Sequence, residues 1–88
     1  MTRWEVLKEH VRDVRKLRNL AMLLRVIESH FDGEVKMEKN LTEYMAKKYR
    51  WGNKTTRKNL DILVNLRLLK CLRSPRDHWT KIYYLLDA

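Results

Sequence analysis

The sequence predicts a single α+β domain that is mostly helical and ends in a β-hairpin. Apolar residues recur every three or four positions through most of the 88 residues, which is the spacing of a helix rather than of a strand. Glycine and proline account for only three residues, so little interrupts those helices. Near the C-terminus, the β-prone segments LLKCLRS and WTKIYYLL flank a polar segment that holds Pro75 and Asp77, and this order is typical of a hairpin.

The first predicted element is one long helix over residues 3–31. Its apolar positions run from Trp4 to Phe31 in steps of three and four, with no glycine or proline between them. Thr2 and Glu5 form a capping-box pattern at its start.

A helix of this length requires a partner for part of its surface. At 1.5 Å per residue it is about 43 Å long, which exceeds the diameter that we expect of so small a domain. We therefore expect a homodimer, with the contact residues Trp4, Leu7, Val11 and Val14. The alternative is that the helix breaks near Asn19 and folds back.

The remaining elements follow in a simple order. Residues 34–37 alternate in polarity and predict a short strand. Asn40 is expected to cap a helix over residues 41–49, and Asn53 is expected to cap another that runs to Leu66. The hairpin then covers residues 68–86.

The most basic segment is residues 45–60, MAKKYRWGNKTTRKNL, which holds six Lys or Arg residues and no acid. Apolar residues are nevertheless spaced evenly through it, from Met45 through Tyr49 and Trp51 to Leu60. Two short helices that pack across a tight turn require this spacing, because each must bury one stripe of side chains. The net charge of the chain is +9, and its concentration here is typical of a surface that binds polyanions such as nucleic acid.

Together these features resemble a winged helix-turn-helix domain over residues 17–88. The helix-turn-helix covers residues 41–66, and the hairpin segment SPRDHWTKIYYL is similar to the wing of MarR-type regulators. In size and composition the chain is more similar to small archaeal plasmid or viral regulators of this fold. Three positions depart from the pattern: Arg50 and Arg67 stand where the family prefers glycine, and Thr56 replaces a Val or Ile.

The resemblance implies sequence-specific binding of double-stranded DNA by a homodimeric transcriptional regulator. The recognition helix is expected in the major groove and the wing in the minor groove, with Asp77 holding the shape of the wing and Arg76 reaching the DNA. Contacts from the recognition helix are expected from Lys54, Thr55, Arg57, Lys58 and Asn59. Phosphate contacts are expected from Lys47, Lys48, Arg50 and Asn53, and wing contacts from Arg73, Arg76, His78 and Lys81.

Other classes of function lack their residues in this sequence. Cys71 is the only cysteine, so no intramolecular disulfide is possible and a reducing, cytoplasmic location is expected. The histidines have no metal-ligand spacing, and no nucleophile is paired with a base. We therefore expect no enzyme activity, metal, cofactor or small-molecule ligand, and no membrane span. The absence of Gln beside 35% charged residues fits a thermophilic source.

Two alternatives to sequence-specific DNA binding remain. The first is a winged-helix protein-interaction module that uses the N-terminal apolar stripe. The second is an architectural protein that coats DNA without reading its sequence. A membrane-surface role for the first helix is less favoured, because Glu5, Glu9 and Asp13 lie on its polar face.

Overall fold

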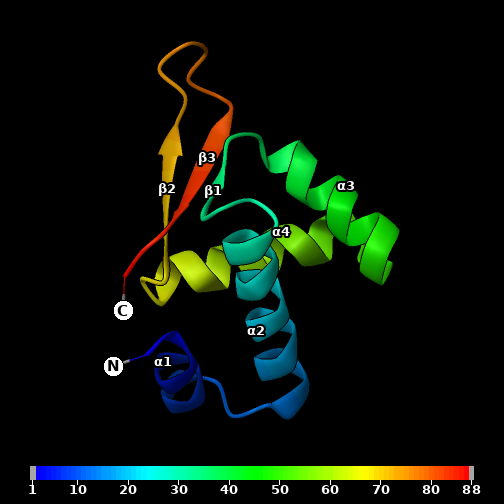
Figure 1. Ribbon diagram of the computed structural model, residues 1–88, viewed down its shortest axis with the longest axis vertical. Coiled ribbons are helices and arrows are strands. Elements are labelled where there is room, and N and C mark those ends of the chain that lie inside the picture. The colour runs from blue at the N-terminus through cyan, green and yellow to red at the C-terminus, as the bar shows by residue number, and fades with distance from the viewer. Residues whose placement is uncertain (1, 88) are drawn as a thin grey trace.

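The computed structural model describes residues 2–87, which form four helices and a three-stranded antiparallel sheet (Figure 1). The helices are α1 (Arg3–His10), α2 (Val14–Ser29), α3 (Glu38–Tyr49) and α4 (Asn53–Asn65). The strands are β1 (Glu34–Val35), β2 (Leu69–Arg73) and β3 (Lys81–Leu85). The mostly helical α+β class predicted from the sequence is confirmed.

Residues 3–31 form two helices, and the prediction of one continuous helix is wrong. α1 ends at His10, Val11 is extended with φ −120° and ψ 112°, and Asp13 is the N-cap of α2. Asp13 Oδ1 accepts hydrogen bonds from the backbone N–H groups of Arg15 at 2.9 Å and Lys16 at 3.1 Å. This cap satisfies N–H groups that a new helix leaves without partners. The alternative prediction had placed the break near Asn19, and in the structure the break lies well before that residue.

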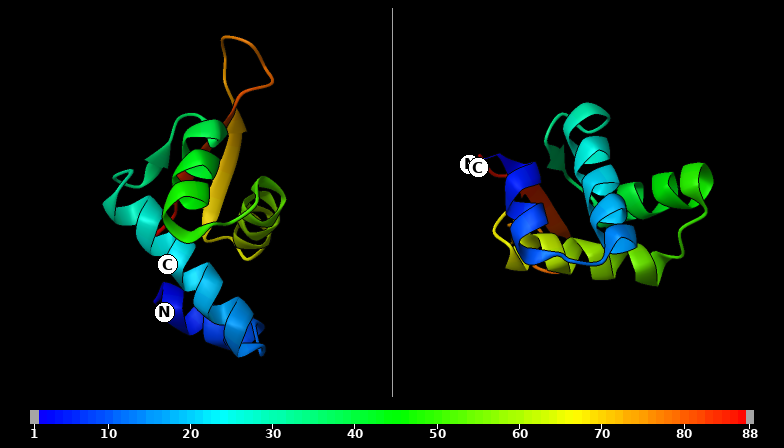
Figure 2. Two further views of the ribbon diagram at one scale, coloured as in Figure 1. Left: turned by 90° about the vertical axis from the view of Figure 1, so that its right-hand side faces the viewer. Right: turned by 90° about the horizontal axis from the view of Figure 1, so that it is seen from below.

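The break lets α1 fold back beside α2, at the end of the molecule far from the hairpin loop (Figures 1 and 2). Leu7 is buried in the core as a result. The prediction that Leu7 contacts a second copy is therefore wrong, because its side chain is already covered within its own chain. The capping box at Thr2 and Glu5 is confirmed: the Thr2 hydroxyl accepts from Glu5 N at 3.2 Å, and Thr2 N donates to Glu5 Oε1 at 3.1 Å.

The predicted starts of the next two helices are wrong. α3 begins at Glu38, three residues before the predicted start, and its N-cap is Met37, which makes no side-chain capping bond. α4 begins at Asn53 itself, so the N-cap position belongs to Gly52. Neither Asn40 nor Asn53 is an N-cap.

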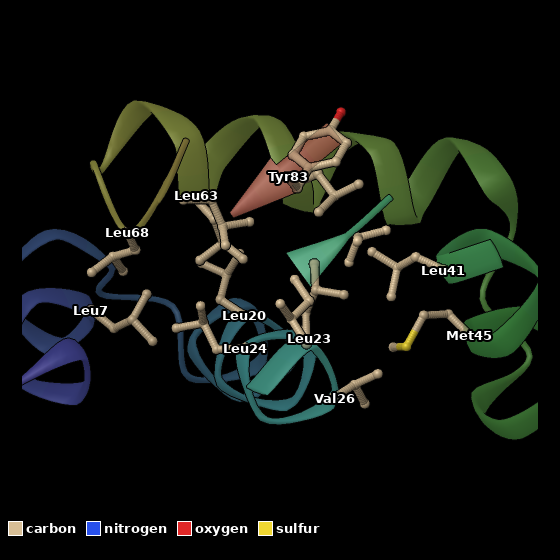
Figure 3. Close-up of a cluster of buried hydrophobic side chains, with 14 residues drawn as sticks. Leu7, Leu20, Leu23, Leu24, Val26, Leu41, Met45, Leu63, Leu68 and Tyr83 are labelled. Carbon is tan, nitrogen blue, oxygen red and sulfur yellow. The ribbon is translucent and has the colours of Figure 1, made fainter. Parts of the chain in front are cut away.

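The core lies where α2 crosses the inner faces of α4 and the sheet (Figure 3). α2 carries a hydrophobic stripe that includes Leu20, Leu23 and Ile27, all fully buried. Because β3 is the central strand in the order β1-β3-β2, its Tyr83 pairs with Val35 on one side and Cys71 on the other. The α3–α4 helix pair and the hairpin are thus fixed to a single core.

Arg50 and Arg67 both adopt the left-handed backbone conformation that glycine favours. Their φ angles are 59° and 61°. Arg50 ends α3, and its N–H donates to Ala46 O at 3.1 Å, whereas Arg67 follows α4 and donates to Val64 O at 3.0 Å. The backbone turns are therefore kept despite the side chains, and Arg50 places a guanidinium at the turn between α3 and α4.

Thr56 carries a fully buried hydroxyl with no hydrogen-bond partner among residues 2–87. We expect Thr56→Val to raise the free energy of unfolding by about 1 kcal/mol, because it removes an unsatisfied polar group at nearly constant shape. Urea denaturation measures this change. Thr42→Val is the matched control, since the Thr42 hydroxyl is also buried but donates to Lys39 O at 3.0 Å. That control is expected to be less stable than the parent chain, and a destabilised Thr56→Val would contradict the prediction.

Candidate nucleic-acid interface

The outward face of α4 carries most of the predicted recognition residues. Lys54, Thr55, Arg57 and Lys58 are all exposed. Asn59 is only 8% exposed, because it follows Thr56 by three positions and shares the inward stripe with Leu63. The prediction that Asn59 contacts DNA is therefore wrong for this structure.

The predicted phosphate contacts surround the turn between α3 and α4. They are all exposed: Lys47, Lys48, Arg50 and Asn53. Lys48 Nζ donates a hydrogen bond to the Tyr44 hydroxyl at 3.0 Å and lies 5.5 Å from the centre of that ring. The hydrogen bond to Tyr44 raises the pKa of Lys48, so its ammonium keeps its charge.

The loop that joins β2 to β3 protrudes from the end of the molecule opposite α1 (Figure 1). Asp77 organises it: Oδ1 accepts from Trp79 N at 3.1 Å and from Thr80 N at 2.9 Å, and Oδ2 accepts from the Thr80 hydroxyl at 2.6 Å. Arg73 Nη1 donates to His78 O at 3.0 Å across the loop. Arg73, Arg76 and His78 are exposed and Lys81 is half-buried, so the predicted wing cations lie in this loop and at the ends of the two strands that it joins.

The hydrogen bonds from the Thr80 side chain and backbone lower the pKa of Asp77 below its ordinary value of 3.8. The ionised carboxylate therefore stabilises the loop above that value, and this contribution is lost as the pH falls through the lowered pKa. We expect the amide resonances of Trp79 and Thr80 to titrate in NMR spectra with a midpoint below 3.8. Asp77→Asn is the control that removes this titration, and a midpoint at or above the ordinary value would contradict the prediction.

Trp79 lies in the same loop and is 79% exposed, a degree of exposure that is unusual for so large an apolar side chain. Sequence reasoning did not single it out. The strand-like alternation of WTKIYYLL placed it among ordinary strand residues, but His78 has φ 63° and the strand begins only at Lys81. The signal in the sequence for an exposed Trp79 was its position directly after the polar tip SPRDH.

A shallow hollow of about 280 Å³ joins this loop to the helices. Its walls come from the start of α3, from α4 and from the residues that enter β3, which are Met37, Glu38, Lys39, Arg57, Trp79, Thr80 and Lys81. Arg57 of α4 and Lys81 of the hairpin therefore line one surface. Lys39 adds a third cation that was not predicted from the sequence.

Glu38 connects three elements at the floor of this hollow. Its Oε1 accepts a hydrogen bond from Arg57 Nε at 2.7 Å, and its Oε2 accepts one from the Tyr83 hydroxyl at 2.7 Å. Burial raises the pKa of Glu38, but the hydrogen bonds from Tyr83 and Arg57 and the charge of Lys81 outweigh it, and the net pKa is lowered. The pKa of Tyr83 is raised well above its usual range, and burial is the largest cause and the hydrogen bond to Glu38 the next. The phenol thus stays a donor to an ionised carboxylate.

A second, apolar hollow of about 450 Å³ lies between α1 and α2. Trp4 and Val14, two of the predicted dimer contacts, are exposed and line it. Val11 is half-buried and packs against the core. The rest of the lining is Leu17, Arg18, Ala21, Met22, Arg25 and Tyr49.

Within residues 2–87 no three His, Cys, Asp or Glu side chains lie close enough to hold a metal ion together. The histidines have separate surroundings: His10 Nδ1 lies 2.9 Å from Val6 O, and the His30 ring stacks on Tyr44 at 4.1 Å between centroids. Over the same residues, no helix has both the length and the apolar character needed to cross a membrane.

Comparisons of the chain with protein-family models, with curated proteins and with solved structures found no match. The functional class of this protein therefore rests on its fold and its cationic surface.

Proposed function

We propose that this chain is a winged helix-turn-helix protein that binds double-stranded DNA in a sequence-specific manner, as a homodimeric transcriptional regulator in the cytoplasm. One observation carries the proposal. Arg57, on the exposed basic face of α4, lines the same hollow as Trp79, Thr80 and Lys81 at the base of the protruding hairpin. Two elements that contact adjacent DNA grooves need this arrangement.

In this proposal α4 enters the major groove with Thr55, Arg57 and Lys58 toward the base edges. Lys54 and the cations around the turn before α4 contact phosphates, which supply affinity without sequence information. Gly52 caps α4 without a side-chain bond, so its first N–H groups are open to a phosphate as well. The hairpin loop carries Arg76 and Trp79 to the flanking minor groove, where Arg side chains are favoured and apolar side chains contact sugars or base steps.

Homodimerisation is assigned to the α1–α2 face. Trp4 and Val14 remain exposed there, and the apolar hollow beside them supplies a surface that a second copy would cover. Two-fold symmetry then implies a palindromic site whose half-sites are separated by about one helical turn or a multiple of it.

The test is selection of the purified protein against a pool of random duplexes at near-physiological salt. A chain with a net charge of +9 retains DNA through counterion release alone, so enrichment of a sequence is the informative result. An enriched palindrome supports the dimeric regulator. A pool that stays random despite tight, salt-sensitive binding supports the architectural alternative. Loss of all DNA at that salt contradicts both.

A protein-interaction module is the second candidate, and the apolar hollow between α1 and α2 favours it. In that case the apolar surface binds a foreign helix instead of a second copy. Trp4→Ala distinguishes the interaction module from the dimeric regulator. If the parent chain does not dimerise and the variant loses binding of a partner protein, the result supports the module. Loss of self-association in analytical ultracentrifugation, together with weaker binding to a two-half-site duplex, supports the regulator.

A further inference from the structure

We infer that Glu38 is a positioning residue for DNA recognition, which holds the Nε side of Arg57 and so leaves only its two terminal nitrogens to bind guanine. The inference rests on the proposed function and goes further in two ways. It names guanine as the base that Arg57 recognises, and it assigns a role to Glu38, which does not contact DNA. Its basis is the chain of hydrogen bonds from Tyr83 through Glu38 to Arg57.

The guanidinium has two edges that fit guanine O6 and N7. One edge is formed by Nε and one terminal nitrogen, and the other by the two terminal nitrogens. Glu38 Oε1 accepts from Nε at 2.7 Å, so the first edge is occupied. Bidentate recognition then requires the second edge, with the side chain approaching the base end-on.

The position of Glu38 is itself fixed. Its side chain is only 17% exposed, while that of Arg57 is 58% exposed. The second carboxylate oxygen is held by the hydroxyl of Tyr83, a buried residue of the central strand. An exposed ion pair contributes little because both side chains move, but here the acceptor is tied to the sheet. A rigidly supported donor set is what direct readout of a base requires.

An acidic residue at a DNA-binding surface also lowers affinity for DNA. This effect on affinity can be measured separately from an effect on base preference, which makes the inference testable. Glu38 repels phosphate, so its removal raises affinity for any DNA if its only contribution is its charge. If it orients Arg57, its removal also lowers the preference for guanine. A purely structural loss reduces the folded fraction and weakens all duplexes alike, leaving the preference unchanged.

The experiment compares four chains, the parent and three variants, on two duplexes. The guanine under Arg57 is first located as the position at which Arg57→Ala loses its preference during selection. Dissociation constants for the selected duplex and for one with adenine at that position are then measured for the parent, Glu38→Gln and Tyr83→Phe. The matched control is Glu43→Gln, which removes an exposed acid of the same helix that pairs with Lys39 at 3.9 Å.

We expect Glu38→Gln to reduce the guanine preference about tenfold, within the range that one bidentate contact supplies, while binding to the adenine duplex stays equal or becomes tighter. Tyr83→Phe is expected to reduce the preference to a smaller extent, and Glu43→Gln to leave it unchanged. An unchanged preference in Glu38→Gln, from a parent chain that does select guanine, overturns the inference and leaves the proposed function intact. A parent chain that binds duplexes with no preference overturns both the inference and sequence-specific recognition.

Discussion

A chain that carries Lys54→Glu and Lys58→Glu is expected to bind its DNA site about 100-fold more weakly at 0.15 M salt, because two phosphate or base contacts are replaced by repulsive charges. Both lysines are exposed on α4, and neither forms an ion pair among the described residues. The salt dependence should fall with the affinity, by about 0.9 in the slope of log K against log salt, because Lys54 is the one of the two lysines that the proposal places on a phosphate. Fluorescence anisotropy with a labelled duplex measures both quantities.

The matched control reverses the same amount of charge elsewhere. Arg12 and Arg15 are exposed near the link between α1 and α2, at the end of the molecule opposite the hairpin loop (Figure 1). Arg12→Glu with Arg15→Glu should weaken binding only a few-fold, through the long-range field. The test chain should still fold, because the Lys54→Glu substitution puts a carboxylate in the first turn of α4, where the helix dipole stabilises a negative charge. Equal losses in the two chains would contradict an interface on α4.

The largest expected effect on stability comes from Leu63→Ala, which should lower the free energy of unfolding by about 3–4 kcal/mol. Leu63 is fully buried on α4, which packs against both α2 and β2. The truncation leaves a cavity where α2, α4 and β2 meet, so packing contacts among three elements are lost. The total free energy of unfolding of so small a domain is low, and this loss is a large share of it. Thermal unfolding should show a fall in Tm of about 15 °C.

Leu72→Ala is the control of the same residue type. Leu72 lies on β2 and is 43% exposed, so its truncation removes little buried area and should change the free energy of unfolding by less than about 1 kcal/mol. If the two substitutions had similar effects, the assignment of the core to the junction of α2, α4 and the sheet would be wrong.

Periodicity identified the helical content and the hairpin but not every boundary. The break between α1 and α2 escaped it, because Val11 and Val14 continue the apolar spacing and no glycine or proline marks the turn. Asp13 was the physical signal, since a short acceptor side chain before a helical segment is a good N-cap. The start of α3 carried no comparable signal, because Met37 caps it without a side-chain bond.

The candidate site was only partly predictable for a related reason. Exposed cations such as Lys54 and Lys58 follow from helical spacing relative to buried Leu60 and Leu63. Asn59 was misplaced because a polar residue on the edge of the inward stripe was assumed to face outward. The interaction of Glu38 with Tyr83 spans 45 positions of sequence, and no local pattern encodes a contact that depends on how the sheet meets α3.

The central place of β3 in the sheet sets the order in which this protein can fold during synthesis. β1 and β2 each pair with β3 and not with one another. The helices can form locally as they emerge from the ribosome, but the sheet cannot form until residues 81–85 have left the exit tunnel. Tyr83, which completes the core and orients Glu38, arrives with that strand. The surface assigned to DNA is therefore completed only after β3 has emerged, when α3 and α4 have already been synthesised.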